Sequence, residues 1–222
     1  ENYYAWEWGD ALFVVLDPFW YSARKRGERS DNWYRTLGQD QYRWLQQTLE
    51  ASRARFKFVF IHHLVGGSDS GGRGGVEAAG FFEWGGKSLN GQRDFEAQRP
   101  GWEMPIHRML VENSISVVFH GHDHFFAKQD VDGVVYQLVP QPAHNRYGNV
   151  RTAREYGYLR LENPRPQQGH SQLASGFTAF GIRADDLRGQ RRRSLGLAAD
   201  RFELPVIGFH SQGDDFVRSV AG

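Results

Sequence analysis

The chain has 222 residues, of which 40% are hydrophobic and 14% aromatic, so it can bury a sizeable core and is not intrinsically disordered. The positive charges of its 27 Lys and Arg nearly cancel the negative charges of its 26 Asp and Glu. The net charge therefore does not indicate a surface that binds nucleic acid or an anionic membrane. The absence of cysteine excludes disulfides, thiolate metal ligands and a cysteine nucleophile, and it favours a secreted or periplasmic protein. No apolar run approaches the roughly 20 residues that cross a bilayer.

The first part of the chain predicts a hairpin, a helix and a strand. Residues 2–8 and 11–16 are rich in aromatic and β-branched residues, and Gly9-Asp10 between them is typical of a hairpin turn. Residues 39–52 carry apolar side chains at helical spacing, which predicts an amphipathic helix. Residues 57–61 form a short apolar run that predicts a buried strand.

The middle of the chain predicts a long irregular connection, then a helix, a strand and a hairpin. Residues 64–103 contain several Gly-Gly pairs, and a connection of this length inside a domain is usually functional. Residues 105–112 predict a second helix, whose first turn tolerates proline. Residues 115–119 predict a second buried strand, and residues 125–129 and 134–139 predict a hairpin.

The last part of the chain is less regular. After about residue 162 the sequence consists mainly of Gln, Arg, Gly and Ser without clear periodicity. Residues 177–182 and 202–209 could each form a short strand. We therefore expect one domain over residues 1–162 and an irregular C-terminal extension over residues 163–222.

Three histidines follow the two predicted buried strands. The predicted order is a strand, a connection that contains a helix, and a second strand. This order predicts two parallel strands joined by a crossover connection. Ligands bind beyond the carboxyl ends of such strands. His62 follows the first strand, and His122 and His124 follow the second. In extended backbone, residues two apart point to the same side, so His122 and His124 would share one cleft and Asp123 would point away. Because imidazole binds Zn, Fe, Mn or Co well, we predict that these three histidines are metal ligands.

A single isolated histidine is more often a packed or surface residue than a metal ligand. That alternative is the expectation for His107, which falls on the second predicted helix. His144 lies close enough in sequence to the other histidines to be a candidate substrate contact. His120 stays unassigned. For the histidines at the two strand ends, the clustering itself argues against the alternative.

Several motifs resemble the calcineurin-like metallophosphoesterase superfamily. Gly121-His122-Asp123-His124 resembles its last metal motif, Gly-His-x-His, and residues 58–63 resemble the preceding motif, in which a single ligand histidine closes a strand. Residues 4–17 resemble its central antiparallel strands. The resemblance covers roughly residues 2–150. Four further short segments resemble a bacterial branch of the superfamily that is similar to the purple acid phosphatases. They are residues 41–45, 83–86, 105–107 and 132–137.

The resemblance implies an α/β fold, namely the C-terminal half of a four-layer α/β/β/α sandwich with mixed sheets. It implies that His62 and His122 bind one metal ion of a dinuclear pair and that His124 binds the other. It also implies that His63 is not a metal ligand and instead contacts the metal ligands or faces the substrate. The glycine-rich segment from Gly66 to Gly86, with Phe81, Phe82 and Trp84, would line the cleft and select the substrate.

The chain also departs from the superfamily pattern. The upstream motifs Asp-x-His, Gly-Asp-x-x-Asp and Gly-Asn-His-Asp/Glu do not occur in it, and Gly9-Asp10 is not followed by an Asp at the required spacing. The complete domain is expected to hydrolyse phosphate mono- or diesters with a hydroxide activated by two metal ions such as Zn, Fe or Mn. The N-terminal half of that domain would lie outside this chain, which alone would be inactive. Two alternatives stay open, a metal-binding fragment without turnover and a mononuclear zinc hydrolase with three histidine ligands.

Overall fold

In the computed structural model, the described part of the chain is residues 2–23, 32–69, 71–139, 156 and 158. The chain divides into two compact units, residues 1–169 and 170–222, and every described residue belongs to the first unit. The predicted boundary at residue 162, the two short strands predicted in the extension and His144 lie outside the described residues. No helix of the described part is long and apolar enough to cross a membrane.

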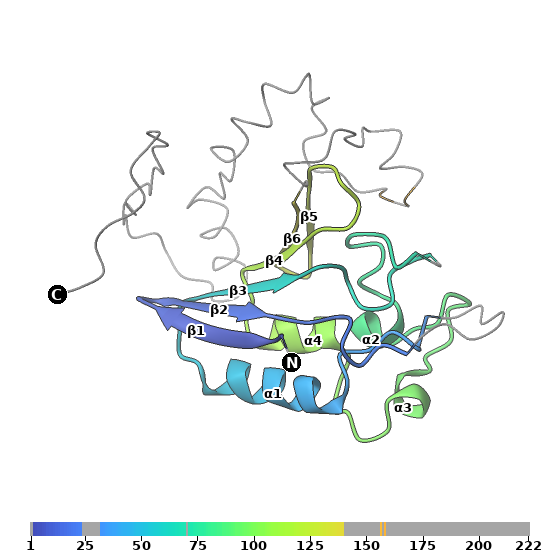
Figure 1. Cartoon of the computed structure of the whole chain (residues 1–222), viewed down its shortest axis with the longest axis horizontal. Coiled ribbons are helices and arrows are strands. Elements are labelled where there is room, and N and C mark those ends of the chain that lie inside the picture. Colours follow the sequence, from blue (N-terminus) through green and yellow to red (C-terminus); the bar gives the residue numbers. More distant parts are fainter. Residues whose placement is uncertain (1, 24–31, 70, 140–155, 157, 159–222) are drawn as a thin grey trace. The chain divides into compact units, whose positions relative to one another are not determined.

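A mixed sheet of six strands organises the first unit, with the strand order β1-β2-β3-β4-β6-β5 (Figure 1). The pairs β1–β2 and β5–β6 are antiparallel, as the two predicted hairpins require. The neighbours β2–β3, β3–β4 and β4–β6 are parallel, which confirms that the two predicted strands β3 and β4 form a parallel pair. The strands are β1 Tyr4–Trp8, β2 Ala11–Val15, β3 Phe56–Ile61, β4 Val117–His120, β5 Ala127–Val131 and β6 Val134–Leu138.

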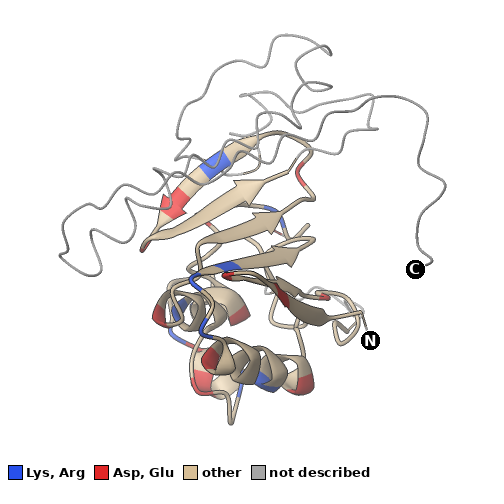
Figure 2. Ribbon diagram, turned by 90° about the vertical axis from the view of Figure 1, so that its left-hand side faces the viewer, with Lys and Arg blue, Asp and Glu red and all other residues tan. Residues whose placement is uncertain are grey.

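Two helices cover one face of the sheet, and both were predicted. They are α1 Gln39–Ala51, which connects β2 to β3, and α4 Ile106–Glu112, which precedes β4. Figure 2 shows the helices together on one side of the sheet. The expectation of an irregular connection over residues 64–103 was wrong in part, because it contains two single-turn helices, α2 Phe82–Gly85 and α3 Phe95–Gln98. Segments of four residues are too short to show helical periodicity in a sequence.

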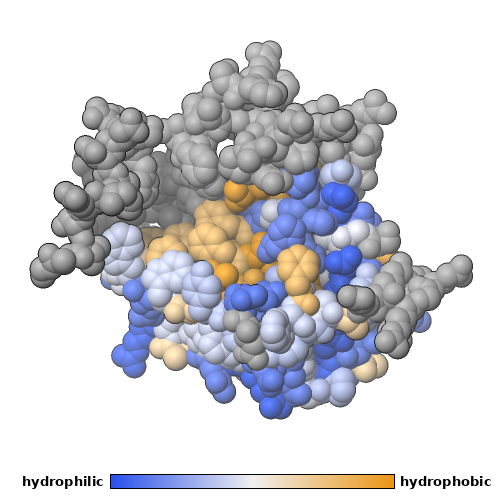
Figure 3. All heavy atoms as spheres, in the orientation of Figure 1, coloured by the Kyte–Doolittle hydropathy of each residue, from blue (hydrophilic) through white to orange (hydrophobic). Residues whose placement is uncertain are grey.

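The two faces of the sheet differ in burial. Side chains alternate along β2 and β3, so that Leu12 and Val59 are buried on the helix side while Phe13 and Phe58 are only half-buried on the other side. Across this second face the aromatic rings stack on their neighbours, with centroid distances of 5.0 Å for Trp6–Phe13 and 5.3 Å for Phe13–Phe58. Figure 3 shows hydrophobic side chains gathered over β2 and β3. We call this row the aromatic face; it consists of Tyr4, Trp6, Phe13, Phe58, Phe60 and Phe119.

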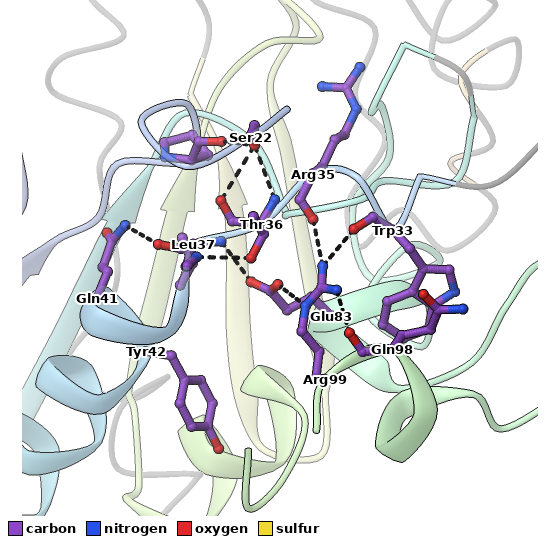
Figure 4. Close-up of polar contacts among 12 residues, drawn as sticks. Ser22, Trp33, Arg35, Thr36, Leu37, Gln41, Tyr42, Glu83, Gln98 and Arg99 are labelled. Atoms are coloured by element: carbon purple, nitrogen blue, oxygen red, sulfur yellow. Dashed lines mark hydrogen bonds and ion pairs between the residues drawn. The ribbon is translucent and has the colours of Figure 1, made fainter. Parts of the chain in front are cut away.

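A buried ion pair fixes the segment before α1. The Arg99 Nε donates to the Glu83 carboxylate at 2.5 Å, and the Glu83 side chain has no exposed surface. The Arg99 Nη2 donates to the carbonyls of Trp33, at 2.7 Å, and Arg35, at 3.1 Å (Figure 4). The second Glu83 oxygen accepts the backbone N–H of Leu37 at 2.8 Å. The pair therefore ties residues 33–37 to α2 and to the end of α3.

Candidate functional site

Two of the predicted ligands meet at the carboxyl ends of β3 and β4. His62 directly follows β3, and His122 lies two residues beyond the end of β4. The backbone N–H of Gly121 donates to the carbonyl of His62 at 2.9 Å, which joins the two strand ends. His62 Nε2 and His122 Nδ1 are 3.2 Å apart. The predicted meeting of these two histidines at one edge of the sheet is thus confirmed, while their role as ligands stays a prediction.

The other ring nitrogen of His122 fixes the orientation of its imidazole. His122 Nε2 lies 3.1 Å from the carbonyl oxygen of Gly71. Because a carbonyl only accepts, Nε2 carries the hydrogen and the lone pair of Nδ1 is directed at His62. Histidines that bind metals usually donate their second N–H to a carbonyl or carboxylate in this way. Two nitrogens on one ion, each at roughly 2.0–2.1 Å, are about 3 Å apart, so the His62–His122 spacing fits a shared ion.

The backbone around His122 differs from the expected extended strand. His122 and His124 have φ angles of 80° and 57°, in the left-handed region. The argument that both imidazoles face one cleft because they are two residues apart in a strand was therefore wrong. His124 is nevertheless close enough to His62 to act on it electrostatically. The pKa of His62 is lowered mainly by burial and further by the positive charges that His122 and His124 can carry.

The described residues do not form a complete metal shell. Among them, no group of three or more His, Cys, Asp or Glu side chains converges on a common point. The described residues thus bring together the imidazoles of His62 and His122 without completing a metal shell.

Asp123 is a buried anchor between the two histidines of the motif, a role that its position in the sequence did not reveal. Its carboxylate accepts hydrogen bonds from Arg73 Nη1 at 3.1 Å, the Gly74 backbone N–H at 3.0 Å and the Tyr158 hydroxyl at 2.6 Å. The side chain is almost completely buried. These bonds hold the glycine-rich segment against the turn, and the same segment supplies the Gly71 carbonyl that orients His122.

Replacing Asp123 with alanine should lower the free energy of unfolding by about 3 kcal/mol, since one hydrogen bond to a charged group is worth roughly 1.5–3 kcal/mol and the losses are not additive. Urea denaturation followed by tryptophan fluorescence measures the change. Asp130→Ala, on the half-buried strand β5, is the matched control and should cost far less. Equal losses in both variants would show that Asp123 is not an anchor.

His63 and His120 are buried behind the pair. Burial lowers the pKa of His63 to about 3, with the charge of Arg35 adding to the effect, and burial lowers the pKa of His120 to about 4. Both rings are therefore neutral near pH 7. Within the described part of the chain, His63 Nδ1 and His120 Nε2 are buried without a hydrogen-bond partner. The ring of His63 is 5.5 Å from that of His122, which places His63 beside the candidate site.

The expectation for the glycine-rich segment was wrong in one respect. Phe82 and Trp84 are fully buried, and the Trp84 indole donates to the Tyr136 hydroxyl at 2.9 Å, so neither lines a cleft. The part of the segment that reaches the histidines is Gly71-Gly72. Gly72 has a φ of 79°, and a Cβ there would lie 3.0 Å from the Arg35 guanidinium and 3.2 Å from the His63 ring. Only glycine lets the backbone pass this close to both side chains.

No family model and no curated protein matches the sequence. Several solved structures are similar to it at 15% identity or less. The structure of PhoD has 15% identity and a TM-score of 0.45, and the match covers 74% of this chain and 34% of that one. Purple acid phosphatase PPD1 from seeds of yellow lupin (Lupinus luteus) has 12% identity and a TM-score of 0.32, covering 62% and 22%. GAP50, the anchor in the inner membrane complex of Plasmodium, has 10% identity and a TM-score of 0.34, covering 80% and 59%.

This chain therefore spans about a third or less of the length of the first two structures. With TM-scores below 0.5, none of these similarities assigns a fold family or an activity to it.

Proposed function

We propose that this chain supplies histidine ligands to a dinuclear metal centre that hydrolyses phosphate mono- or diesters, as the C-terminal half of a calcineurin-like metallophosphoesterase domain. His62 and His122 bind one ion and His124 binds the other. The observation that supports this proposal best is the approach of His62 Nε2 to His122 Nδ1 at 3.2 Å, with His122 Nε2 held by the Gly71 carbonyl. The ions, of which Zn, Fe and Mn are candidates, would supply the Lewis acidity that activates water and offsets charge on the phosphoryl group.

The residues around the pair position it. The Gly71 carbonyl keeps His122 in the tautomer that leaves Nδ1 free to coordinate. The ring of Phe19 lies beside both imidazoles, with its centroid 5.4 Å from that of His62 and 5.3 Å from that of His63. Asp17 fixes the backbone at Phe19, because its carboxylate accepts the backbone N–H of Phe19 at 2.8 Å.

The aromatic face supports the proposed sandwich. A sheet that has helices on one face and a row of half-buried or exposed aromatic rings on the other resembles one half of a core. Figure 2 and the sequence agree that the central strands carry little charge, since Lys57 is the one charged residue in β2, β3 and β4. We propose that a second β-sheet, formed by sequence outside this chain and bearing the carboxylate ligands, packs on the aromatic face.

A single cysteine in this cysteine-free chain tests that packing. The thiol of Phe13→Cys should react readily with a maleimide in the 222-residue chain, and at least about tenfold more slowly in a longer protein that includes the predicted upstream motifs, because burial blocks access. Ala51→Cys, exposed at the end of α1, is the control and should react alike in both. Slow labelling of Phe13→Cys in the 222-residue chain itself would contradict the proposal that sequence outside this chain covers the face.

Metal counting and activity test the function directly. We expect two ions per molecule and hydrolysis of a model phosphodiester in the longer protein, and little activity in the 222-residue chain, because each ion would lack carboxylate ligands there. Metal content is measured by plasma mass spectrometry after dialysis. Robust hydrolysis by the 222-residue chain would contradict the proposal.

A metal-binding fragment without turnover is the second candidate function. It is favoured by one observation, that the described residues bring together two imidazoles and no third metal-binding side chain. One ion per molecule and no hydrolysis in the longer protein would support it.

A further inference from the structure

Arg35 lies beside the histidine cluster although it is far from it in sequence. Its Nη1 is 3.3 Å from Nε2 of His63. A guanidinium only donates hydrogen bonds, so His63 Nε2 is the acceptor and the hydrogen is on Nδ1. The His63 ring is in turn 5.8 Å from that of His62 and 5.5 Å from that of His122. A permanent positive charge is thus placed next to His63, the ring that lies beside the two imidazoles at the strand ends.

The backbone of Arg35 is held rigidly, while its side chain is directed at the cluster. The Arg35 carbonyl accepts from Arg99, whose partner Glu83 also accepts the N–H of Leu37 two residues later. Figure 4 shows the guanidinium of Arg35 pointing away from this ion pair. The backbone of Gly72 passes close to the Arg35 guanidinium and limits the space around it. The two arginines thus have different roles: Arg99 neutralises the buried Glu83 carboxylate, and Arg35 extends toward the histidines.

This placement suits an anionic ligand. A guanidinium offers a planar set of N–H donors that matches two oxygens of a phosphoryl group. His63 supports this role by accepting from the Arg35 Nη1 through its Nε2, which keeps the guanidinium beside the histidine cluster. The carboxylate nearest in sequence to the pair, that of Asp123, is already satisfied by Arg73, the Gly74 backbone N–H and Tyr158.

We propose that Arg35, supported by His63, is the phosphoryl-binding residue of this site. This assignment rests on the proposed function, and it adds a residue that holds the substrate anion rather than the metal. Arg35 binds two phosphoryl oxygens and sets the orientation of the ester relative to the His62–His122 pair. The Glu83–Arg99 ion pair acts through Arg35 as a positioning device.

Binding of inorganic phosphate to the 222-residue chain, followed by phosphorus NMR with and without Zn²⁺, tests the proposal. Arg35→Gln should weaken phosphate binding at least about tenfold, as expected for the loss of charge-assisted bonds, and Arg35→Lys should recover part of the loss because it keeps the charge without the fork. The affinity for Zn²⁺, titrated separately, should stay within about twofold, because Arg35 is not a ligand. Arg43→Gln, exposed on α1, removes the same charge elsewhere and should change neither affinity.

The outcomes separate this inference from the proposed function. Phosphate binding by Arg35→Gln equal to that of the parent chain, or no phosphate binding by the parent chain at millimolar concentration, would overturn the role of Arg35. Neither result affects the metal centre. Conversely, Zn²⁺ binding that is unchanged in His62→Ala and His122→Ala would refute the metal centre, while the titration without Zn²⁺ still reports on Arg35.

Discussion

Replacing His122 with alanine is expected to abolish phosphoesterase activity in a protein that joins these residues to the predicted upstream motifs. His122 Nδ1 faces His62 Nε2 at 3.2 Å, so its loss removes one of the two imidazoles that would share an ion. Residues that merely orient a metal ligand are worth about 10–100-fold in affinity or activity, so loss of a ligand should cost at least about 100-fold. Initial rates with a model phosphodiester and the metal content of the same sample measure both consequences.

The fold should survive this change. His122 is only half-buried and lies in a turn at the edge of the sheet, so its removal leaves the core intact. His107→Ala is a matched control on α4, where the His107 imidazole contacts the Tyr136 hydroxyl at 2.7 Å and Asp132 at 3.0 Å. We expect His107→Ala to keep full activity and to lose some stability, the reverse of His122→Ala. Parent-like activity with two bound ions in His122→Ala would remove His122 from the site.

The meeting of His62 with His122 could be predicted because it follows from topology alone. The sequence has an apolar run that ends at residue 61, then a helix, then a second apolar run. This order predicts two parallel strands, and the carboxyl ends of parallel strands lie at the same edge of a sheet. That inference does not depend on which distant side chains fill the space around the strands. The aromatic face was not predicted, because residues 57–61 and 115–119 were expected to be buried strands, whereas Phe58, Phe60 and Phe119 are only half-buried.

The parts that could not be predicted depend on contacts across long stretches of chain. Asp123 is an anchor only because Arg73, 50 residues earlier, returns to the turn. Arg35 reaches His63 across 28 residues, and its position depends on a buried ion pair of which each member looks like an ordinary surface residue in the sequence. The aromatic residues of the glycine-rich segment pointed to a cleft, but Trp84 donates a hydrogen bond to Tyr136, 52 residues away, and lies in the core.

Replacing Arg99 with methionine is expected to destabilise the protein by about 3–5 kcal/mol, the usual cost of leaving one member of a buried ion pair without its partner. The Glu83 carboxylate would stay fully buried and would keep the Leu37 N–H as its backbone donor, while the carbonyls of Trp33 and Arg35 would lose their donor. Urea denaturation measures the loss. If Arg99→Met unfolds at the same urea concentration as the parent, the pair does not hold residues 33–37.

The pH dependence of this loss identifies its cause. Burial raises the pKa of Glu83, and the positive charge of Arg99 opposes that rise. In Arg99→Met the opposition is removed, so the pKa of Glu83 in the folded state moves further above its unfolded value. Between its unfolded and its folded pKa, such a carboxyl group is protonated in the folded state and ionised in the unfolded state. The free energy of unfolding therefore falls as the pH increases through the range between these two pKa values. The deficit of Arg99→Met should therefore be smallest in acid and grow toward neutral pH.

Adding Glu83→Gln to Arg99→Met should remove this pH dependence and recover part of the stability, because the neutral amide keeps an acceptor for Leu37 without a buried charge. A deficit that is independent of pH in the single variant would assign the loss to packing rather than to charge.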